Sequence, residues 1–368
     1  MKNSNLLKKI PLYLPALLLL ISFSCTSDSK QTPVQNKDEE NFQVPKLTQQ
    51  GIVSKEPGDS EEYTKYNSIR DEGPVIPGIF QSAVPQGMAY YSEADLMFIS
   101  NYMFDGRPSC ITVLTMADGL LKKVLWILNP DGSVHTDHVG GLAVSKKHLW
   151  IASGKGVYYV ALEELNALSD NSNLKMTDFI QTAVKASFAT FANGFLWVGE
   201  FASRDGSYSV PISHHFKTAE GDLNHAWLAG FRLSSLSDLI NQDNTTDGVA
   251  NPDYILSIPD EVQGALFVDD RIILSQSYGR KNNSRISVYS NPLEDPEDSS
   301  YTADDSRFIP VWILDELHLE QEITAPPMTE GIVDYKGSTA VLFESGSDKY
   351  RTSAKNPQDR IDILKFLP

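Results

Sequence analysis

A hairpin pattern recurs five times between residues 85 and 344, and it limits the folds open to this chain. In each copy two short apolar runs are joined by a tight turn; the copies are residues 85–101, 138–153, 187–200, 262–276 and 330–344. Successive residues of a strand point to opposite faces, so a continuous apolar run predicts a strand that is buried on both faces. One hairpin cannot bury two faces alone, so the copies must stack against each other.

Further apolar segments accompany each hairpin. A third segment follows the hairpin, at residues 111–115, 157–161, 229–233, 285–289 and 360–366. A fourth precedes the next hairpin, at residues 122–128, 176–184, 252–258 and 308–314. Four antiparallel strands per unit, arranged radially, predict an all-β fold, a β-propeller of five four-stranded blades, with six blades as the alternative. The last unit lacks a fourth segment, so an N-terminal strand from residues 63–80 is expected to close the propeller ring.

The spacing of the units predicts where the chain departs from the repeat. Glycine takes the same place in four copies, and Phe188 takes it in the third. Some spacings exceed the ~40–50 residues of a blade, so we expect an insertion at residues 202–227. Short helices are expected after two third strands, at residues 162–168 and 236–241.

Residues 1–24 predict a bacterial export signal. Three lysines precede an apolar stretch, residues 10–23, that is shorter than the ~20 residues of a membrane span. Residues 21–25 resemble the lipobox of bacterial lipoproteins, although two positions depart from its strict pattern. This resemblance implies a lipidated Cys25, with palmitate among its acyl groups, and a lipid-anchored protein of the cell envelope, which we place at the outer membrane. A plain secretory signal with an incidental Cys is the alternative.

The composition of the chain predicts a tether and excludes two classes of protein. Residues 25–74 are polar and acidic, which predicts a flexible tether ahead of a propeller at residues 75–368; within the tether, residues 63–70 are expected to dock as a strand. The chain has a net charge of −17 and two cysteines. These values argue against nucleic-acid binding and against a disulfide scaffold. Cys110 lies in an alternating segment and is interpreted as a buried, inert thiol. We expect a monomer.

The repeat over residues 75–368 is similar to that of the superfamily of gluconolactonase/senescence-marker-protein and strictosidine-synthase-like propellers. In that superfamily, the members that hydrolyse lactones or esters use a divalent metal at the channel, held by scattered Glu, Asn and Asp. No continuous motif carries those ligands, so the resemblance assigns none of them here.

Propeller geometry predicts a polar site at one mouth of the channel. Each inner strand begins where its neighbouring second strand ends, so polar side chains at these points converge. The predicted ligand-binding residues are Gln86, Asn101, His138, Gln263, Gln276 and Arg280. The predicted catalytic carboxylates, an acid and a base of a hydrolase, are drawn from Glu200, Glu330 and Glu344. As a metal site, Glu200, Glu344 and Asn101, with Glu330, offer oxygen ligands that suit Ca²⁺. A purely structural network of hydrogen bonds is the third interpretation.

Other polar clusters are interpreted as turns rather than as metal sites. These are His135 with Asp137 and His138, His214 and His215 with His225, and residues 243–248. The preferred function is an exported lipoprotein that binds a small-molecule or protein ligand at the channel mouth or serves as a scaffold. A metal-dependent lactone or ester hydrolase and a surface adhesin are the alternatives, and the sequence leaves open whether the protein is an enzyme.

Overall fold

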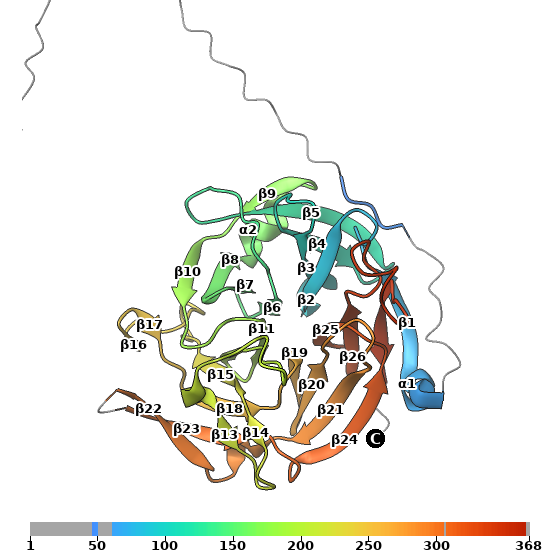
Figure 1. Cartoon of the computed structure of the whole chain (residues 1–368). Helices are drawn as coiled ribbons and strands as arrows, with labels where there is room; N and C mark the ends of the chain where they lie inside the picture. The colour runs from blue at the N-terminus through green and yellow to red at the C-terminus, as the bar shows by residue number, and fades with distance from the viewer. Residues whose placement is uncertain (1–45, 51–60, 305–306, 366–368) are drawn as a thin grey trace, which may run out of the picture. The chain divides into compact units, whose positions relative to one another are not determined.

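The computed structural model describes residues 46–50, 61–304 and 307–365, and these form a five-bladed β-propeller (Figure 1). The predicted fold is therefore confirmed, and the hairpin repeat supplies the two inner strands of every blade. In order from the channel outward, the blades consist of the following strands. Blade 1 has β2 (Ala83–Tyr91), β3 (Leu96–Met103), β4 (Cys110–Thr115) and β5 (Leu120–Leu128). Blade 2 has β6 (Gly141–Val144), β7 (His148–Ser153), β8 (Gly156–Ala161) and β10 (Asp178–Gln181).

The other three blades follow the same order. Blade 3 has β11 (Phe188–Ala192), β12 (Phe195–Gly199), β15 (Ala226–Arg232) and β18 (Tyr254–Ile258). Blade 4 has β19 (Val262–Val268), β20 (Arg271–Gln276), β21 (Ser284–Ser290) and β24 (Leu319–Ala325). Blade 5 has β25 (Thr329–Tyr335), β26 (Ser338–Phe343), β27 (Arg360–Leu364) and β1 (Arg70–Val75).

Additional elements decorate this frame. Strand β9 (Ser172–Lys175) pairs in parallel with β5, and β23 (Arg307–Ile313) pairs in parallel with β18 and carries β22 (Ser299–Asp304). Two small hairpins are β13 (Phe216–Lys217) with β14 (Leu223–Asn224) and β16 (Thr245–Thr246) with β17 (Val249–Ala250). The helices are α1 (Thr64–Ile69), α2 (Leu162–Ala167), η1 (Glu61–Tyr63), η2 (Ser92–Ala94), η3 (Ile212–His214) and η4 (Pro292–Glu294). None of the described helices is long and apolar enough to span a membrane.

Three local predictions are wrong. Residues 308–314 were expected as the fourth strand of blade 4, but β23 joins the outer edge of blade 3 and β24 takes that place. Residues 236–241 form a turn rather than a helix, because Asp238 has a left-handed φ of 60° that ends any helical run. Residues 63–69 dock as η1 and α1 rather than as a strand. The helix predicted at residues 162–168 is confirmed by α2.

Glycines let the inner strands of neighbouring blades approach each other closely. A Cβ atom on Gly87 would lie 2.6 Å from the Cα of Gly141, and one on Gly331 would lie 2.8 Å from the backbone N of Met88. Such distances exclude any larger side chain at these positions. In blade 3, Phe188 takes the glycine position, and its aromatic ring packs over Gly199. The repeated glycine is therefore a requirement of packing around the channel.

The propeller ring is closed by the segment that precedes blade 1. Strand β1 pairs antiparallel with β27, which confirms the predicted N-terminal closing strand. Tyr63 and Tyr66 are fully buried against blades 4 and 5. The Tyr66 hydroxyl donates to the buried Asp362 carboxylate at 2.7 Å, and Arg70 Nη1 donates to the same group at 3.2 Å. These residues, which were predicted to lie in the tether, thus join the N-terminal segment to the last blades of the ring. This segment, residues 61–75, is called the N-terminal clasp below.

Candidate functional site

Irregularities in three inner strands form the base of the predicted channel mouth. The pairing register shifts between Pro85 and Met88 in β2, between Val262 and Gly264 in β19, and between Thr329 and Ile332 in β25. A β-bulge at such a point leaves a residue unpaired and redirects its side chain. The residues in the bulges are those predicted to converge at the mouth, Gln86, Gln263 and Glu330.

Two carboxyl groups meet at this mouth. Glu330 lies in β25 and Glu344 directly follows β26, and their side chains are hydrogen-bonded to each other. Gln86 Nε2 donates to Glu344 Oε2 at 3.1 Å, and Gln263 Nε2 donates to Glu330 Oε1 at 3.4 Å. The structure therefore brings together four predicted residues from blades 1, 4 and 5 in one chain of hydrogen bonds.

The carboxyl pair holds a proton near neutral pH. Glu330 is 3% exposed, and its burial together with the neighbouring Glu344 carboxyl raises the pKa of Glu330 well above its usual range. Burial also raises the pKa of Glu344 to about 7, although Gln86 and the nearby cations Lys349 and Arg280 act in the opposite direction. Two carboxyls this close cannot both ionise without strong repulsion. The pair thus contains both a proton donor and an acceptor.

Cations and tyrosines surround the carboxyl pair. Lys349 Nζ donates to the Tyr102 hydroxyl at 2.6 Å, and this hydroxyl lies 3.1 Å from that of Tyr350. Lys349 Nζ and the Arg280 Cζ lie 4.9 Å and 4.8 Å from the centre of the Tyr350 aromatic ring. Neither cation forms a salt bridge among the described residues, and Arg280 Nη1 donates a hydrogen bond to Ser353 Oγ at 3.3 Å. Burial, the Tyr350 hydroxyl and the acidic pair raise the pKa of Tyr102.

His138 completes this side of the mouth. Its aromatic ring meets Tyr102 edge-on, with centroids 4.1 Å apart. Partial burial and the nearby Lys349 ammonium lower the pKa of His138. The residue is therefore a neutral hydrogen-bonding group at pH 7, beside a buried tyrosine.

Three other predicted residues form hydrogen bonds with their own neighbours rather than with the carboxyl pair. The buried Glu200 accepts hydrogen bonds from His214 Nδ1 at 2.9 Å and from the Trp227 backbone N at 3.2 Å. Gln276 donates to the Asp260 carbonyl and accepts from Ser287 within blade 4. Asn101 donates to the Ile99 carbonyl, and its buried Oδ1 lacks a hydrogen-bond partner among the described residues.

The residues predicted to bind Ca²⁺ lie in separate hydrogen-bond networks in this structure. Glu200 is hydrogen-bonded to His214, whereas Glu344 is hydrogen-bonded to Gln86 and to Glu330. A divalent cation requires ionised carboxylates that converge on one point. No group of three or more His, Cys, Asp or Glu side chains in the described part of the chain is arranged to hold a metal ion.

The weaker sequence candidates have local partners. His135 Nδ1 lies 2.8 Å from Asn129 Oδ1, and His225 Nδ1 lies 2.9 Å from the Asp260 carboxylate. Residues 243–248 lie in the β16–β17 hairpin, which turns at Asp247 and Gly248 with positive φ. Cys110 is buried and free, and burial raises the pKa of its thiol to about 12. Cys25 lies outside the described residues.

Sequence reasoning missed three residues of the mouth, Tyr102, Lys349 and Tyr350. Tyr102 follows Asn101 in β3, so an extension of the predicted strand by one residue would have found it. Lys349 and Tyr350 lie in the loop between β26 and β27, which carries no recurring pattern. Only the fold brings that loop to the mouth.

Further along the channel, past the repeated glycines of the inner strands, residues from all five blades line a cavity of about 450 Å³. Most of its lining side chains are apolar, including Met88, Leu142, Phe191, Leu266 and Ile332. Ser92, Thr190, Asp334 and Lys336 also line it, so this part of the channel offers both apolar and polar surface.

Comparison with known proteins assigns no reaction to this chain. No family model matches the chain. No curated protein matches it either. Among solved structures, it is similar to a glutaminyl cyclase of Myxococcus xanthus, with 10% identity, 81% of this chain and 94% of that one covered, and a TM-score of 0.39. It is also similar to a glucose dehydrogenase-type oxidoreductase of Thermus thermophilus, with 11% identity, coverage of 80% and 99%, and a TM-score of 0.39. A luciferin-regenerating enzyme matches with 11% identity, coverage of 77% and 92%, and a TM-score of 0.38. At these values no activity is assigned to this chain, which is a β-propeller module.

Proposed function

We propose that this protein is a ligand-binding β-propeller of the bacterial cell envelope, and that its channel mouth captures a small organic anion. The observation that carries this proposal is the pair of cations on Tyr350. Lys349 and Arg280 lie on that aromatic ring without a salt bridge among the described residues, in a chain whose net charge is −17. An anionic ligand would supply the missing partner.

The rest of the mouth suits the polar part of such a ligand. The Glu330–Glu344 pair offers one proton to donate and further oxygens to accept, and His138 and Tyr102 add neutral groups. Groups of both kinds around an aromatic surface are typical of sites that orient a small molecule.

Citrate and malate, with erythritol as a neutral counterpart, provide the test by ligand-observed NMR and thermal shift. Binding of a carboxylate is expected to weaken about tenfold in Lys349→Ala, since a charge-assisted hydrogen bond contributes roughly 1.5 kcal/mol. Lys281→Ala is the matched control, because it removes the same charge one residue from Arg280. Equal binding of erythritol, or an equal loss in both variants, would contradict the proposal. Adding Ca²⁺ in the same assay tests the sequence-based prediction of a calcium site.

A hydrolase is the second candidate, and the proton-sharing carboxyl pair favours it. An acid and a base that titrate near neutral pH are what general acid–base catalysis requires. Direct hydrogen bonding between the two groups differs from the separation of about 5 Å or more that glycosidases use. Hydrolysis of a p-nitrophenyl ester that Glu344→Gln abolishes, with citrate binding retained, would establish this function.

Export and lipidation remain part of the proposal. Support comes from the three N-terminal lysines, the apolar stretch at residues 10–23 and the lipobox-like residues that end at Cys25. The full chain expressed in a Gram-negative host is expected to incorporate labelled palmitate and to fractionate with the outer membrane. Cys25→Ala should abolish the label, whereas Cys110→Ala should keep it. A labelled Cys25→Ala protein would refute lipidation at this residue.

A further inference from the structure

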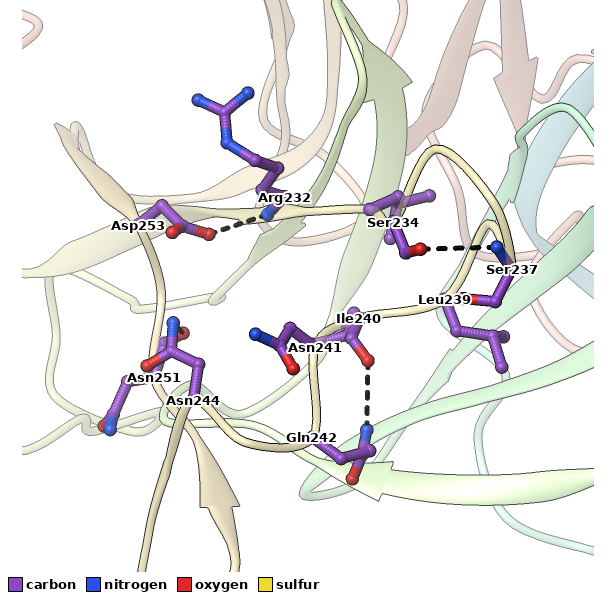
Figure 2. A pocket seen from close by; sticks show the side chains of 11 residues that line it. Arg232, Ser234, Ser237, Leu239, Ile240, Asn241, Gln242, Asn244, Asn251 and Asp253 are labelled. Carbon is purple, nitrogen blue, oxygen red and sulfur yellow. Dashed lines mark hydrogen bonds between the residues drawn. The ribbon is translucent and has the colours of Figure 1, made fainter.

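A second pocket, of about 570 Å³, lies beside the C-terminal end of β15, next to blade 3 (Figure 2). Strand β15 ends at Arg232, and the chain from residue 233 to residue 251 folds back to enclose it. The channel mouth is built at the opposite ends of the strands, since β15 begins near Glu200. The lining residues used below are Arg232, Asn241, Gln242, Asn244, Asn251 and Asp253.

This loop is held in place by its neighbours. Asp238 accepts hydrogen bonds from Ser145 Oγ at 2.6 Å and from the Lys147 backbone N at 2.8 Å, which ties the loop to blade 2. The Asn251 backbone N donates to the Asn244 carbonyl at 2.9 Å, and Asn251 Nδ2 donates to Thr246 Oγ1 at 2.8 Å. The pocket is therefore formed before any ligand binds.

One amide in the lining has an unmet hydrogen-bonding capacity. Asn244 Nδ2 donates to the Asn251 carbonyl at 3.1 Å, and this bond fixes which end of the amide carries the oxygen. Asn244 Oδ1 is shielded from solvent and lacks a hydrogen-bond partner among the described residues. An unpaired buried acceptor is unfavourable by about 1–3 kcal/mol. Because this oxygen is closed to solvent, the amides that a ligand can reach are those of the exposed Asn241 and Gln242.

The remaining lining indicates a neutral ligand with many hydroxyls. Figure 2 shows the labelled Asn241, Asn244 and Asn251 in the loop, with Arg232 at the end of β15 and Asp253 just before β18. The Arg232 guanidinium lies 4.3 Å from the Phe195 ring centre, and no salt bridge to it is formed within the described chain. Its charge and that of Asp253 offset each other, so neither a cation nor an anion is favoured overall. Amides both donate and accept, as adjacent sugar hydroxyls do.

We infer that this pocket is a carbohydrate-binding site for a neutral saccharide. The amides of Asn241 and Gln242 hydrogen-bond to its hydroxyls, and Leu239 contacts its apolar C–H groups. The site is separate from the channel mouth and does not depend on the function proposed there.

Saturation-transfer NMR and thermal shift with maltose, cellobiose and lactose at about 20 mM test this inference. At least one disaccharide is expected to bind, and Gln242→Ala and Arg232→Met should each weaken it about fivefold or more. The exposed Asn173→Ala on β9 is the matched amide control, and Lys349→Ala at the mouth should leave saccharide binding unchanged. Thermal unfolding of every variant confirms that it is folded.

Three outcomes would overturn the inference: no signal from any of the three disaccharides, binding that both pocket variants retain, or binding that Lys349→Ala removes. A thermal shift with Ca²⁺ that Asp253→Asn abolishes, in the absence of saccharide binding, would identify a cation site instead and would equally overturn it.

Discussion

Stability is expected to fall as the pH rises from about 5 to 8, and Glu330→Gln should remove much of that fall. The unfolded chain releases the glutamate protons near the ordinary pKa of 4.5, whereas burial raises the pKa of Glu344 to about 7 and that of Glu330 well above its usual range. Within this window the folded state binds more protons than the unfolded state, so stability falls as pH rises. The folded protein is therefore more stable at pH 5, where the carboxyl pair keeps its protons, than at pH 8.

The expected difference is on the order of 2 kcal/mol between pH 5 and pH 8, since one unit of pKa corresponds to about 1.4 kcal/mol. Glu330→Gln keeps the shape of the side chain and removes the repulsion, so it should stabilise the protein at pH 8 and change little at pH 5. Denaturant unfolding at both pH values measures this. Asp362, whose pKa burial raises to about 6, contributes a slope of the same sign in every variant. The exposed Glu163→Gln is the control, and an unchanged slope in Glu330→Gln would show that the pair does not share a proton.

A chain that begins at Ile76 is expected not to fold. It lacks η1, α1 and β1, and with them the burial of Tyr63, Tyr66 and Ile69. Each such side chain contributes about 1.5–3 kcal/mol. The loss also leaves the buried Asp362 without Tyr66 and Arg70, which costs about 3–5 kcal/mol. Together these losses reach the whole stability of a typical domain, about 5–15 kcal/mol.

A chain that begins at Val44 is the matched control and should unfold like the full protein, because it keeps every described residue, the first of which is residue 46. Tyr66→Phe isolates the hydroxyl and should cost about 1–2 kcal/mol through the lost hydrogen bond to Asp362. Circular dichroism and thermal melting measure all three proteins. A cooperative transition within a few degrees of the full chain, in the protein that begins at Ile76, would show that the N-terminal clasp is dispensable.

The inner part of each blade could be predicted from sequence, and the outer edges could not. Inner strands are buried on both faces, so runs such as residues 149–151 and 272–274 stand out as apolar. Outer strands face solvent on one side. β24 has three consecutive polar residues in Leu319-Glu320-Gln321-Glu322-Ile323, whereas β23 contains the more apolar Val311-Trp312-Ile313. Hydrophobicity alone therefore selected β23 for blade 4, although only the pairing of the strands distinguishes the two.

The candidate site could likewise be predicted only where its residues lie at repeated positions. Gln86, Gln263, Glu330 and Glu344 lie at repeated positions of the hairpins, so topology alone was enough to predict their convergence. Glu200 occupies the equivalent position in blade 3, but the insertion after β12 brings His214 to its carboxylate. Insertions and long loops, which carry no repeat, decide which residues at repeated positions stay free for a ligand.

The clasp between the two ends of the chain also has a consequence for the time course of folding. Arg70 in β1 pairs with Leu364 in β27, partners that are 364 − 70 = 294 residues apart. Contacts between such distant residues form late and slow the folding of a domain. The ring cannot close during synthesis until its last strand has been made. Closure of the ring by β1 and β27 would therefore be the final step of folding, after synthesis of the last strand.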